Sequence, residues 1–319
     1  MKMRGKELLL AIFMGVVLPG VMFAVAEKLL PAEKISGPVT EQTQETTSPM
    51  ASAEKLIAVL QEDGTICNME IEEYLVGVVL GEMPLSFDME ALKAQAVVAR
   101  TYTLRRSTVS RKHQGGAVCT NAACCQAYCS PEVFDSESLE KAKFAVSVTA
   151  GQVVTYNGAL IEATYFSCSG GRTEDAVAVW GEDVPYLQAV DSPGEENATH
   201  YTDTINFTAG DFSRLLGLSI KGNPATWLGQ VTYTDGGGVA TMTIGGVVFK
   251  GTELRQKLGL PSTAFSASSA GGIIKIVTKG FGHRVGMSQY GAEAMALDGS
   301  SYEEILAHYY PGTSLTDYS

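Results

Sequence analysis

The strongest candidate for acid–base chemistry in this sequence is one glutamate, Glu82, which stands directly before Met83 and Pro84. A residue that precedes proline is biased away from helical dihedral angles, so a turn is expected directly after Glu82. A carboxylic acid on a rigid turn, desolvated by apolar neighbours such as Met83 and Leu85, can donate a proton near neutral pH. The local pattern alone favours a simpler interpretation, a solvated carboxylate without a catalytic role.

A second group of reactive side chains lies between residues 107 and 131. One histidine and four cysteines gather there: His113, Cys119, Cys124, Cys125 and Cys129. Imidazole and thiolates bind Zn²⁺ tetrahedrally, and a site with three protein ligands keeps one position open for chemistry. The spacing is not that of a standard zinc finger. A Cys119–Cys129 disulfide and vicinal thiols without a ligand are therefore alternatives.

Two glycine-rich segments supply further polar groups. Residues 167–174 follow a predicted strand and combine two glycines with small hydroxyl side chains, which lets a ligand approach the backbone closely. Residues 280–292 place His283, Ser288 and Gln289 around the predicted start of a helix. The simpler interpretations are an ordinary tight turn and a histidine that only orders its loop.

The element that must position Glu82 is a central helix, predicted from about Asp88 to Arg106. Ser86 and Asp88 are both possible N-caps, and the following residues are strong helix formers rich in alanine, which predicts close packing. Glu82 is therefore expected on a turn just ahead of a buried helix. The segment before it, 71–80, is compatible with a helix or a strand.

The other predicted elements alternate between helices and strands, which indicates an α+β protein with central helices packed on mostly antiparallel sheets. Asn157-Gly158 predicts a tight hairpin turn, and Ser301 with Glu304 predicts a capping box. The predicted strands are 54–59, 152–156, 159–166, two within 229–245, and 273–277; the predicted helices are 139–149, 211–216, 252–258, 288–298 and 302–309.

The N-terminus carries an uncharged run from Leu8 to Ala26, long enough to span a bilayer as a helix. Basic residues precede it, so its N-terminal side is expected in the cytoplasm. A cleaved signal peptide ending at Ala24-Val25-Ala26 is the alternative. The expected organisation is a cytoplasmic tip and transmembrane anchor at 1–27, a flexible linker at 28–53 and an extracytoplasmic domain at 54–319.

Composition narrows the partners. The chain has 319 residues, 45% of them hydrophobic, and a net charge of −12 with a pI of about 4.9. A sizeable core is therefore expected. Nucleic acid is not an expected partner, because its recognition calls for a basic surface. A largely neutral glycan is compatible with this charge.

The sequence resembles the stage II sporulation protein D family, peptidoglycan lytic transglycosylases of endospore-forming bacteria. The resemblance extends over most of 55–319 and implies that Glu82 is the catalytic acid of a two-lobed domain with a glycan cleft. The segments that carry it are 73–79 (EYLVGVV), 82–84 (EMP), 90–102 (EALKAQAVVARTY), 167–174 (SCSGGRTE) and 280–292 (GFGHRVGMSQYGA). The substrate-binding residues that the resemblance implies are Ser167, Ser169, Gly170, Gly171, Arg172, His283, Ser288, Gln289 and Tyr290.

The resemblance also implies a bound metal, and it shows two positions at which this sequence departs from the family pattern. Some clostridial members carry zinc on one histidine and two cysteines, which implies His113, Cys119 and Cys125 as ligands, with Cys124 and Cys129 as alternates. Cys168 stands where threonine is usual and Arg284 where glycine is usual, so their roles are open. Trp180, in a segment that also matches, is either a platform for a sugar ring or a core residue.

The function that the resemblance implies is cleavage of the MurNAc–GlcNAc bond in denuded glycan strands, with 1,6-anhydro-MurNAc products, during septal wall remodelling and forespore engulfment. The implied location is the cell membrane at the septum. The implied partners are the stage II sporulation protein P amidase and other engulfment membrane proteins. One alternative is an exported glycan-binding modifier of an amidase without its own catalysis. Another is a zinc hydrolase that uses His113 and the cysteines.

Overall fold

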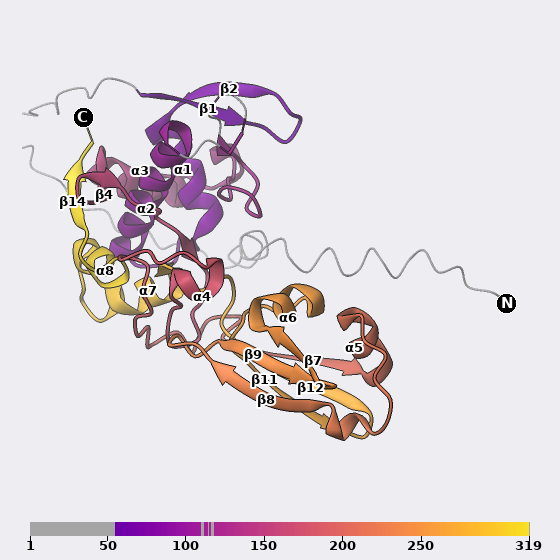
Figure 1. Cartoon of the computed structure of the whole chain (residues 1–319). Coiled ribbons are helices and arrows are strands. Elements are labelled where there is room, and N and C mark those ends of the chain that lie inside the picture. Colours follow the sequence, from indigo (N-terminus) through magenta and orange to yellow (C-terminus); the bar gives the residue numbers. More distant parts are fainter. Residues whose placement is uncertain (1–54, 110–111, 114, 116–117, 319) are drawn as a thin grey trace, which may run out of the picture.

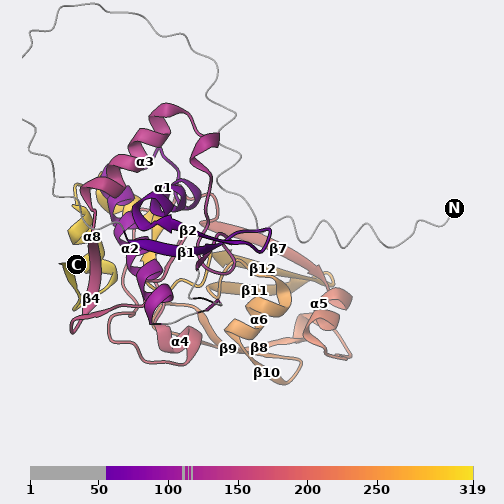
Figure 2. The same ribbon diagram turned by 90° about the horizontal axis from the view of Figure 1, so that it is seen from above.

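The computed structural model describes residues 55–318 apart from 110–111, 114 and 116–117. Two separate hydrophobic cores define two lobes (Figures 1 and 2). The first lobe is formed by the early part of the chain and by its C-terminal part, coloured indigo to magenta and yellow in Figure 1. The second lobe, coloured mainly orange, is formed by the segment between them. The predicted α+β class and the two lobes are thus confirmed.

The first lobe combines most of the helices with three small sheets. Its elements are β1 (Leu56–Leu60), β2 (Ile66–Glu70), α1 (Ile71–Glu82), α2 (Met89–Thr108), β3 (Val118–Cys119), η2 (Pro131–Val133), α3 (Ser136–Val148), β4 (Gln152–Tyr156), β5 (Ala159–Leu160), β6 (Tyr165–Phe166), α4 (Ala176–Trp180), β13 (Met287–Ser288), α7 (Gln289–Leu297), α8 (Tyr302–Tyr309) and β14 (Ser314–Asp317).

The second lobe consists of two three-stranded antiparallel sheets with two helices. Its elements are β7 (Thr202–Thr208), α5 (Ala209–Leu216), η3 (Pro224–Thr226), β8 (Leu228–Tyr233), β9 (Val239–Ile244), β10 (Val247–Lys250), α6 (Gly251–Leu258), β11 (Phe265–Ala270) and β12 (Ile273–Lys279). The strand orders are β10-β9-β8 and β11-β12-β7. Helices α5 and α6 contact each other and lie next to one another in both views.

The predicted central helix is α2, which contacts α1, α3, α7, α8 and β4. Its N-cap is Asp88, whose side chain accepts a hydrogen bond from the Glu90 amide at 2.9 Å. Between Ala91 and Leu104 almost every residue is buried, as the alanine-rich sequence predicts. Arg100 is also buried there and forms an ion pair with Glu72 of α1 at 2.6 Å. The helix therefore serves as the rigid centre of the first lobe.

The sheets are mostly antiparallel, as predicted, but two pairs of strands in the first lobe are parallel. One joins β1 to β3. The other joins β6 to β13, with Tyr165 opposite Met287 and Phe166 opposite Ser288. The β6–β13 pair places the two glycine-rich segments of the sequence side by side, although more than a hundred residues separate them.

Two local predictions were wrong. Glu82 is the last residue of helix α1 and does not itself lie on a turn, although the expected break directly after it is confirmed, since Met83 is extended at φ −127° and ψ 144°. The strand predicted at 159–166 is broken, because β5 ends at Leu160 and the chain then leaves β4 to pair with β13. Glu162, in the break, forms ion pairs with Arg105 and Arg106 of α2.

Other local predictions are confirmed. Asn157 and Gly158 both have positive φ, as a tight hairpin turn requires, and α8 begins with the predicted capping box. The segment 71–80 is helical. In the described part of the chain, no helix has the length and hydrophobicity needed to cross a bilayer. The predicted anchor at 1–27 and linker at 28–53 lie outside the described residues.

Candidate active site

Glu82 is held at the C-terminal end of α1 by a segment that crosses this helix closely. Gly77 and Gly81, one helical turn apart, leave room for that segment: a methyl group at Gly77 would overlap the Tyr128 ring, and one at Gly81 would lie 2.9 Å from the Tyr128 amide nitrogen. Because the chain passes so near, the Ala127 amide donates a hydrogen bond to Glu82 Oε1 at 2.6 Å. The glycines of α1 thus allow a backbone donor to reach the candidate acid.

Two side chains from other elements complete the surroundings of Glu82. The Tyr165 hydroxyl of β6 lies 3.1 Å from Oε1, and the Gln289 amide of α7 donates to Oε2 at 3.2 Å. The Glu82 residue is only partly buried and keeps some contact with solvent. A recessed carboxyl group with remaining access is the arrangement that a proton donor to a bound substrate requires.

The electrostatics of this site favour the protonated acid. Burial raises the pKa of Glu82 above its usual 4.5, while the hydrogen bonds from Ala127, Tyr165 and Gln289 oppose this effect only in part. No ion pair to Glu82 is formed among the described residues, so no cation stabilises its charge. The environment therefore holds a proton on Glu82 at a higher pH than on an exposed glutamate.

Sequence reasoning missed Gln126 and Tyr165, which extend the network around Glu82. Gln126 is buried; its Nε2 donates to Thr103 Oγ1 at 2.9 Å and its Oε1 lies 3.1 Å from the Tyr165 hydroxyl. The only signal in the sequence for these two residues was their position next to segments that had been singled out. Gln126 directly follows the cysteine pair, and Tyr165 stands just before the 167–174 segment.

The loop at 167–171 is organised around a buried carboxylate that the sequence did not reveal. Glu195 is 1% exposed, and its two oxygens accept hydrogen bonds from five groups. These donors are Cys168 Sγ at 3.2 Å, the amides of Ser169 and Gly170 at 2.7 and 2.9 Å, Ser169 Oγ at 2.9 Å and Ser192 Oγ at 2.6 Å. Cys168 therefore donates to Glu195 and does not belong to the cysteine cluster.

Arg284 occupies a backbone conformation that explains why glycine is usual at this position. Its φ is +67°, in the left-handed region that favours glycine. Its side chain is buried and donates to the carbonyls of Ser169, Arg172 and Gly236 at 2.7–2.8 Å. It also faces the buried Glu174 at 3.7 Å. Arg284 thus ties the 167–174 loop to a turn of the second lobe.

The remaining predicted substrate residues lie in different places. His283 Nδ1 accepts from the Val285 amide at 3.1 Å, and its ring packs on Trp180, which is 44% exposed. Ser288 is buried as the N-cap of α7, and both Ser288 Oγ and the Tyr290 amide donate to the Ser167 carbonyl. Arg172 reaches outward to Asp191 and the Asp235 carbonyl.

Of the predicted substrate residues, then, only Gln289 contacts Glu82 directly. Gly170 and Gly171 both have positive φ, and with Ser169 they form the loop around Glu195. Tyr290 packs edge-on against Phe87 with ring centroids 5.1 Å apart. Within the described residues, the candidate site therefore consists of Glu82 with three donors, flanked by a loop that a separate carboxylate holds in shape.

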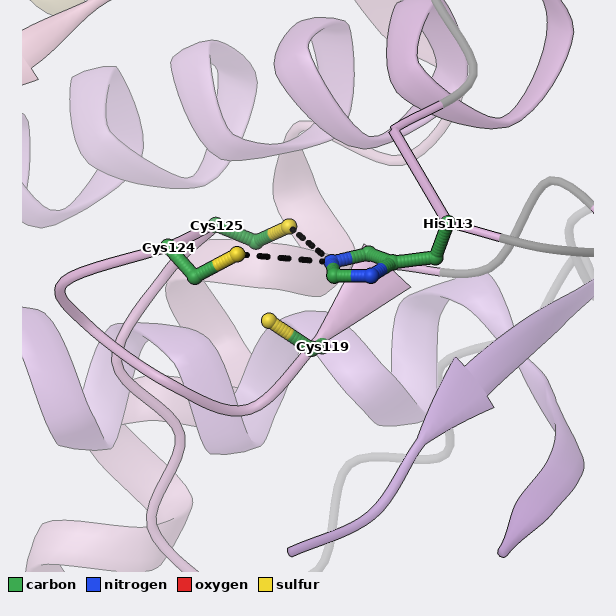
Figure 3. A group of neighbouring side chains, drawn as sticks. All are labelled: His113, Cys119, Cys124 and Cys125. Atoms are coloured by element: carbon green, nitrogen blue, oxygen red, sulfur yellow. Dashed lines mark hydrogen bonds between the residues drawn. The ribbon is translucent and has the colours of Figure 1, made fainter. Parts of the chain in front are cut away.

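Four side chains of the kind that can bind a metal gather in one cluster (Figure 3). The ligand atoms of His113, Cys119, Cys124 and Cys125 all lie within 4.8 Å of one another, with Cys124 and Cys125 sulfur atoms 3.4 and 3.5 Å from His113 Nε2. One imidazole and three thiols match a tetrahedral donor set. The cluster contains the three predicted ligands and adds Cys124. Cys129 is not part of it.

All six cysteines are free thiols, so the alternative Cys119–Cys129 disulfide is not formed. The cluster continues directly into the candidate site along the chain. Cys125 is followed by Gln126 and Ala127, which contact Tyr165 and Glu82. Holding the four ligand side chains together thus also fixes the segment that supplies a donor to Glu82.

Fold and site together define an α+β protein of two lobes that carries one recessed acid beside a histidine–cysteine cluster. Sequence comparisons agree on its relatives. A family profile described as "Stage II sporulation protein" matches residues 61–156. Stage II sporulation protein D of Bacillus amyloliquefaciens is 42% identical over 261 residues, covering 78% of this chain and 75% of the relative. The protein of the same name from Bacillus subtilis is 40% identical over 260 residues, with the same coverage.

The chain belongs to the stage II sporulation protein D family, whose members are sporulation proteins. A more distant relative is the amidase enhancer of Bacillus subtilis, 32% identical over 302 residues. That alignment covers 76% of this chain and 40% of the enhancer. The resemblance inferred from the motifs around Glu82 is confirmed.

Proposed function

We propose that this protein is a peptidoglycan lytic transglycosylase that cleaves the MurNAc–GlcNAc bond of denuded glycan strands with Glu82 as its acid. The observation that carries this proposal is the environment of Glu82. Burial raises its pKa, three donors from three segments orient it, and access remains for a substrate. Among the described residues, no second carboxylate is hydrogen-bonded or paired with it. A single carboxyl group suits a reaction that does not use water.

The proposed reaction has two halves. Glu82 first gives its proton to the oxygen that bridges the two sugars, and this bond to the muramic anomeric carbon breaks. The C6 hydroxyl of the same muramic sugar then forms a bond to that carbon, and its proton goes to the Glu82 carboxylate. The product carries a 1,6-anhydro ring and the acid is regenerated. General acid–base help of this kind contributes a factor of about 10²–10⁴ to the rate.

Positioning of the glycan must supply much of the remaining rate enhancement. Gln289 is the predicted substrate residue that touches the acid. The exposed face of Trp180 offers an apolar surface to a sugar ring. These features support a glycan as the substrate.

The biological setting that we propose follows from the family. The protein would remodel septal peptidoglycan during forespore engulfment, beside the stage II sporulation protein P amidase and other engulfment membrane proteins. Residues 1–27 would form a cytoplasmic tip and a membrane anchor, 28–53 a linker and 54–319 the extracytoplasmic domain. Fractionation of sporulating cells, with the protein extracted by detergent but not by salt, tests the anchor.

We further propose zinc as the occupant of the cluster. Thiolates with one imidazole suit Zn²⁺, and Cys124 as a fourth protein ligand would fill the tetrahedral shell. A filled shell has no position for water, so the role of the metal would be structural. This arrangement speaks against the alternative of a zinc hydrolase that uses His113 and the cysteines.

A second candidate function is a glycan-binding modifier of a wall amidase without its own catalysis. The observation that favours it is the 32% identity to a protein named amidase enhancer. The recessed acid in its donor network favours the enzyme instead, because a binding surface has no use for a carboxyl group with a raised pKa.

The substitution Glu82→Gln separates the two functions. It should reduce cleavage of denuded strands by a factor of about 10²–10⁴ while strand binding in a pull-down assay is retained. Glu293→Gln is the matched control: Glu293 is another partly buried glutamate with a raised pKa, and it accepts from the Asp88 amide outside the site. Its cleavage rate should stay within a few-fold of the wild type. Unchanged cleavage in Glu82→Gln would refute the proposed catalytic acid.

A further inference from the structure

The hydroxyl group of Tyr165 faces more acceptors than it has hydrogens. It lies 3.1 Å from Oε1 of Glu82 and also 3.1 Å from Oε1 of Gln126. A tyrosine hydroxyl carries one hydrogen and therefore donates to one of these oxygens at a time. Burial, with Glu82 nearby, raises the pKa of Tyr165 well above its usual value of 10.0, so the hydroxyl keeps its hydrogen.

The orientation of Gln126 makes its carbonyl oxygen one of the two competitors. Its Nε2 donates to Thr103 Oγ1 at 2.9 Å and to the Tyr74 hydroxyl at 3.4 Å. The carbonyl oxygen therefore points to Tyr165. The Gln126 residue is 1% exposed, and a buried carbonyl without a donor is costly. In the part of the chain that the structure describes, the Tyr165 hydroxyl is the donor placed to satisfy it.

The direction of the Tyr165 hydrogen is consequently linked to the proton on Glu82. When Tyr165 donates to Gln126, its oxygen presents a lone pair to Glu82 Oε1, and a hydrogen between these two oxygens must come from protonated Glu82. When Glu82 is a carboxylate, the hydrogen of Tyr165 is drawn to it instead, because hydrogen bonds to charged acceptors are stronger. Only one hydrogen rotates between the two arrangements.

We propose that Tyr165 and Gln126 act as a hydrogen-bond switch that favours the acid form of Glu82 before bond cleavage and supports its carboxylate afterwards. This inference rests on the proposed function. Gln126 holds the Tyr165 hydrogen while Glu82 carries its proton. After that proton passes to the bridging oxygen, the hydroxyl turns to the carboxylate, and it turns back when the C6 hydroxyl returns a proton. Tyr165 itself neither gains nor loses a proton, and both residues are positioning residues.

The other groups around Glu82 do not replace this switch in setting the protonation of Glu82. Tyr74 of its own helix α1, Tyr165 of β6 and Cys129 of the segment after the cluster are the titratable groups that interact with it. Helix α7 contributes the neutral Gln289. None of these groups is a cation, and none forms an ion pair with Glu82 in the described residues.

The test is a ¹³C NMR titration of the Glu82 carboxyl carbon in the full-length protein, labelled at glutamate and assigned with Glu82→Gln. Gln126→Met should lower the pKa of Glu82 by about one unit, because Tyr165 then donates to the carboxylate without competition. Tyr165→Phe should raise this pKa, because the carboxylate loses a donor. The double variant should match Tyr165→Phe, because Gln126 acts through the hydroxyl.

Tyr310→Phe is the matched control. The Tyr310 hydroxyl is buried but donates to the Thr164 carbonyl, so its loss should lower stability without moving the pKa of Glu82. A Gln126→Met variant that leaves or raises this pKa, or that lowers it equally without the Tyr165 hydroxyl, would overturn the switch. If Gln126→Met does not fold, Tyr165→Phe decides, since an unchanged or lowered pKa contradicts the proposal.

The same variants connect the switch to catalysis. Cleavage of denuded strands requires protonated Glu82, so the pH at which activity falls on the alkaline side should move down in Gln126→Met and up in Tyr165→Phe. If the wild-type protein does not cleave strands at any pH, the proposed function fails, whereas the NMR titration still tests the switch.

Discussion

Glu82 and Glu195 show how the same type of side chain, a glutamate, can serve two different purposes. Both carboxyl groups are recessed, and both accept hydrogen bonds from backbone amides and from hydroxyl groups. Glu195 is 1% exposed and has five donor groups around its two oxygens, which leaves no lone pair for a substrate. Glu82 has three donors and keeps contact with solvent. The number of donors and the remaining access separate a candidate acid from a structural anchor.

Replacing each glutamate by glutamine should give the largest contrast. In Glu82→Gln, activity should fall by a factor of about 10²–10⁴. Its stability at pH 7 should equal or exceed that of the wild type. A raised pKa means that the folded state holds the proton longer than the unfolded state, so the wild type loses stability as pH rises from 4.5 through the folded pKa. Urea unfolding at pH 4 and pH 7 measures this difference.

In Glu195→Gln, by contrast, stability should fall by at least about 2 kcal/mol, because an amide NH₂ group would meet the amides of Ser169 and Gly170. Cleavage should also fall, since the loop loses its anchor. Urea unfolding at pH 7 with the same substitution at exposed Glu196 as control checks this. A Glu195→Gln variant of wild-type stability would contradict the structural assignment.

The cysteine cluster should affect the Glu82 region and leave the Glu195 region unchanged. Purified protein should contain one zinc per chain, and Cys125→Ser should lose it. Because Gln126 and Ala127 follow Cys125, amide hydrogen exchange should accelerate at 119–128 but not at 167–171.

Cys129→Ser is the matched control for this experiment, because Cys129 lies close to the cluster in sequence but outside the ligand group. It should retain the metal, as measured by elemental analysis. Metal loss in Cys129→Ser, or retention in Cys125→Ser, would show that the ligand set is wrong. Cys124→Ser decides whether a fourth thiol binds the metal.

A smaller effect is expected from His283, whose ring packs on Phe166 and Trp180. Burial, and then the charge of Arg255, lower its pKa from 6.5 to about 4, while a backbone hydrogen bond with Tyr165 opposes this. His283 is therefore neutral in the folded state. The stability that neutral His283 contributes to the folded state is complete above pH 6.5 and is lost as the pH falls toward 4.

The variant His283→Gln should therefore lose less stability than the wild type between pH 7 and pH 5, by on the order of 1 kcal/mol. Urea midpoints at the two pH values measure this, with His308→Gln as a control for the loss of a surface imidazole. If the stability of the wild type and of His283→Gln depended equally on pH, a group other than His283 would cause the loss of stability at acid pH.

Local features were the part of the structure that the sequence predicted well. The α2 helix, the Asn157-Gly158 turn and the α8 capping box depend on residues close together in the chain. The family resemblance selected Glu82 and three members of the cysteine cluster. It did not predict that Glu82 ends a helix. Pro84 restricts the backbone angles of Met83, the residue directly before it, but not those of Glu82.

The donors around both glutamates could not be predicted, because they join distant segments. Ala127 reaches Glu82 only because two glycines of α1 allow close packing, and Glu195 meets Ser169 through a loop without a distinguishing motif. The contacts of Arg284 depend likewise on a turn in the second lobe. Long-range hydrogen bonds of this kind leave no spacing pattern in the sequence.

The measurement that tests the central claim most directly is mass spectrometry of the ends of denuded glycan strands after digestion by the full-length protein. A lytic transglycosylase with Glu82 as its acid predicts 1,6-anhydro-MurNAc ends from the wild type and at least about 10²-fold fewer from Glu82→Gln. Reducing MurNAc ends would contradict it, because they would show attack by water and require a second group to activate that water.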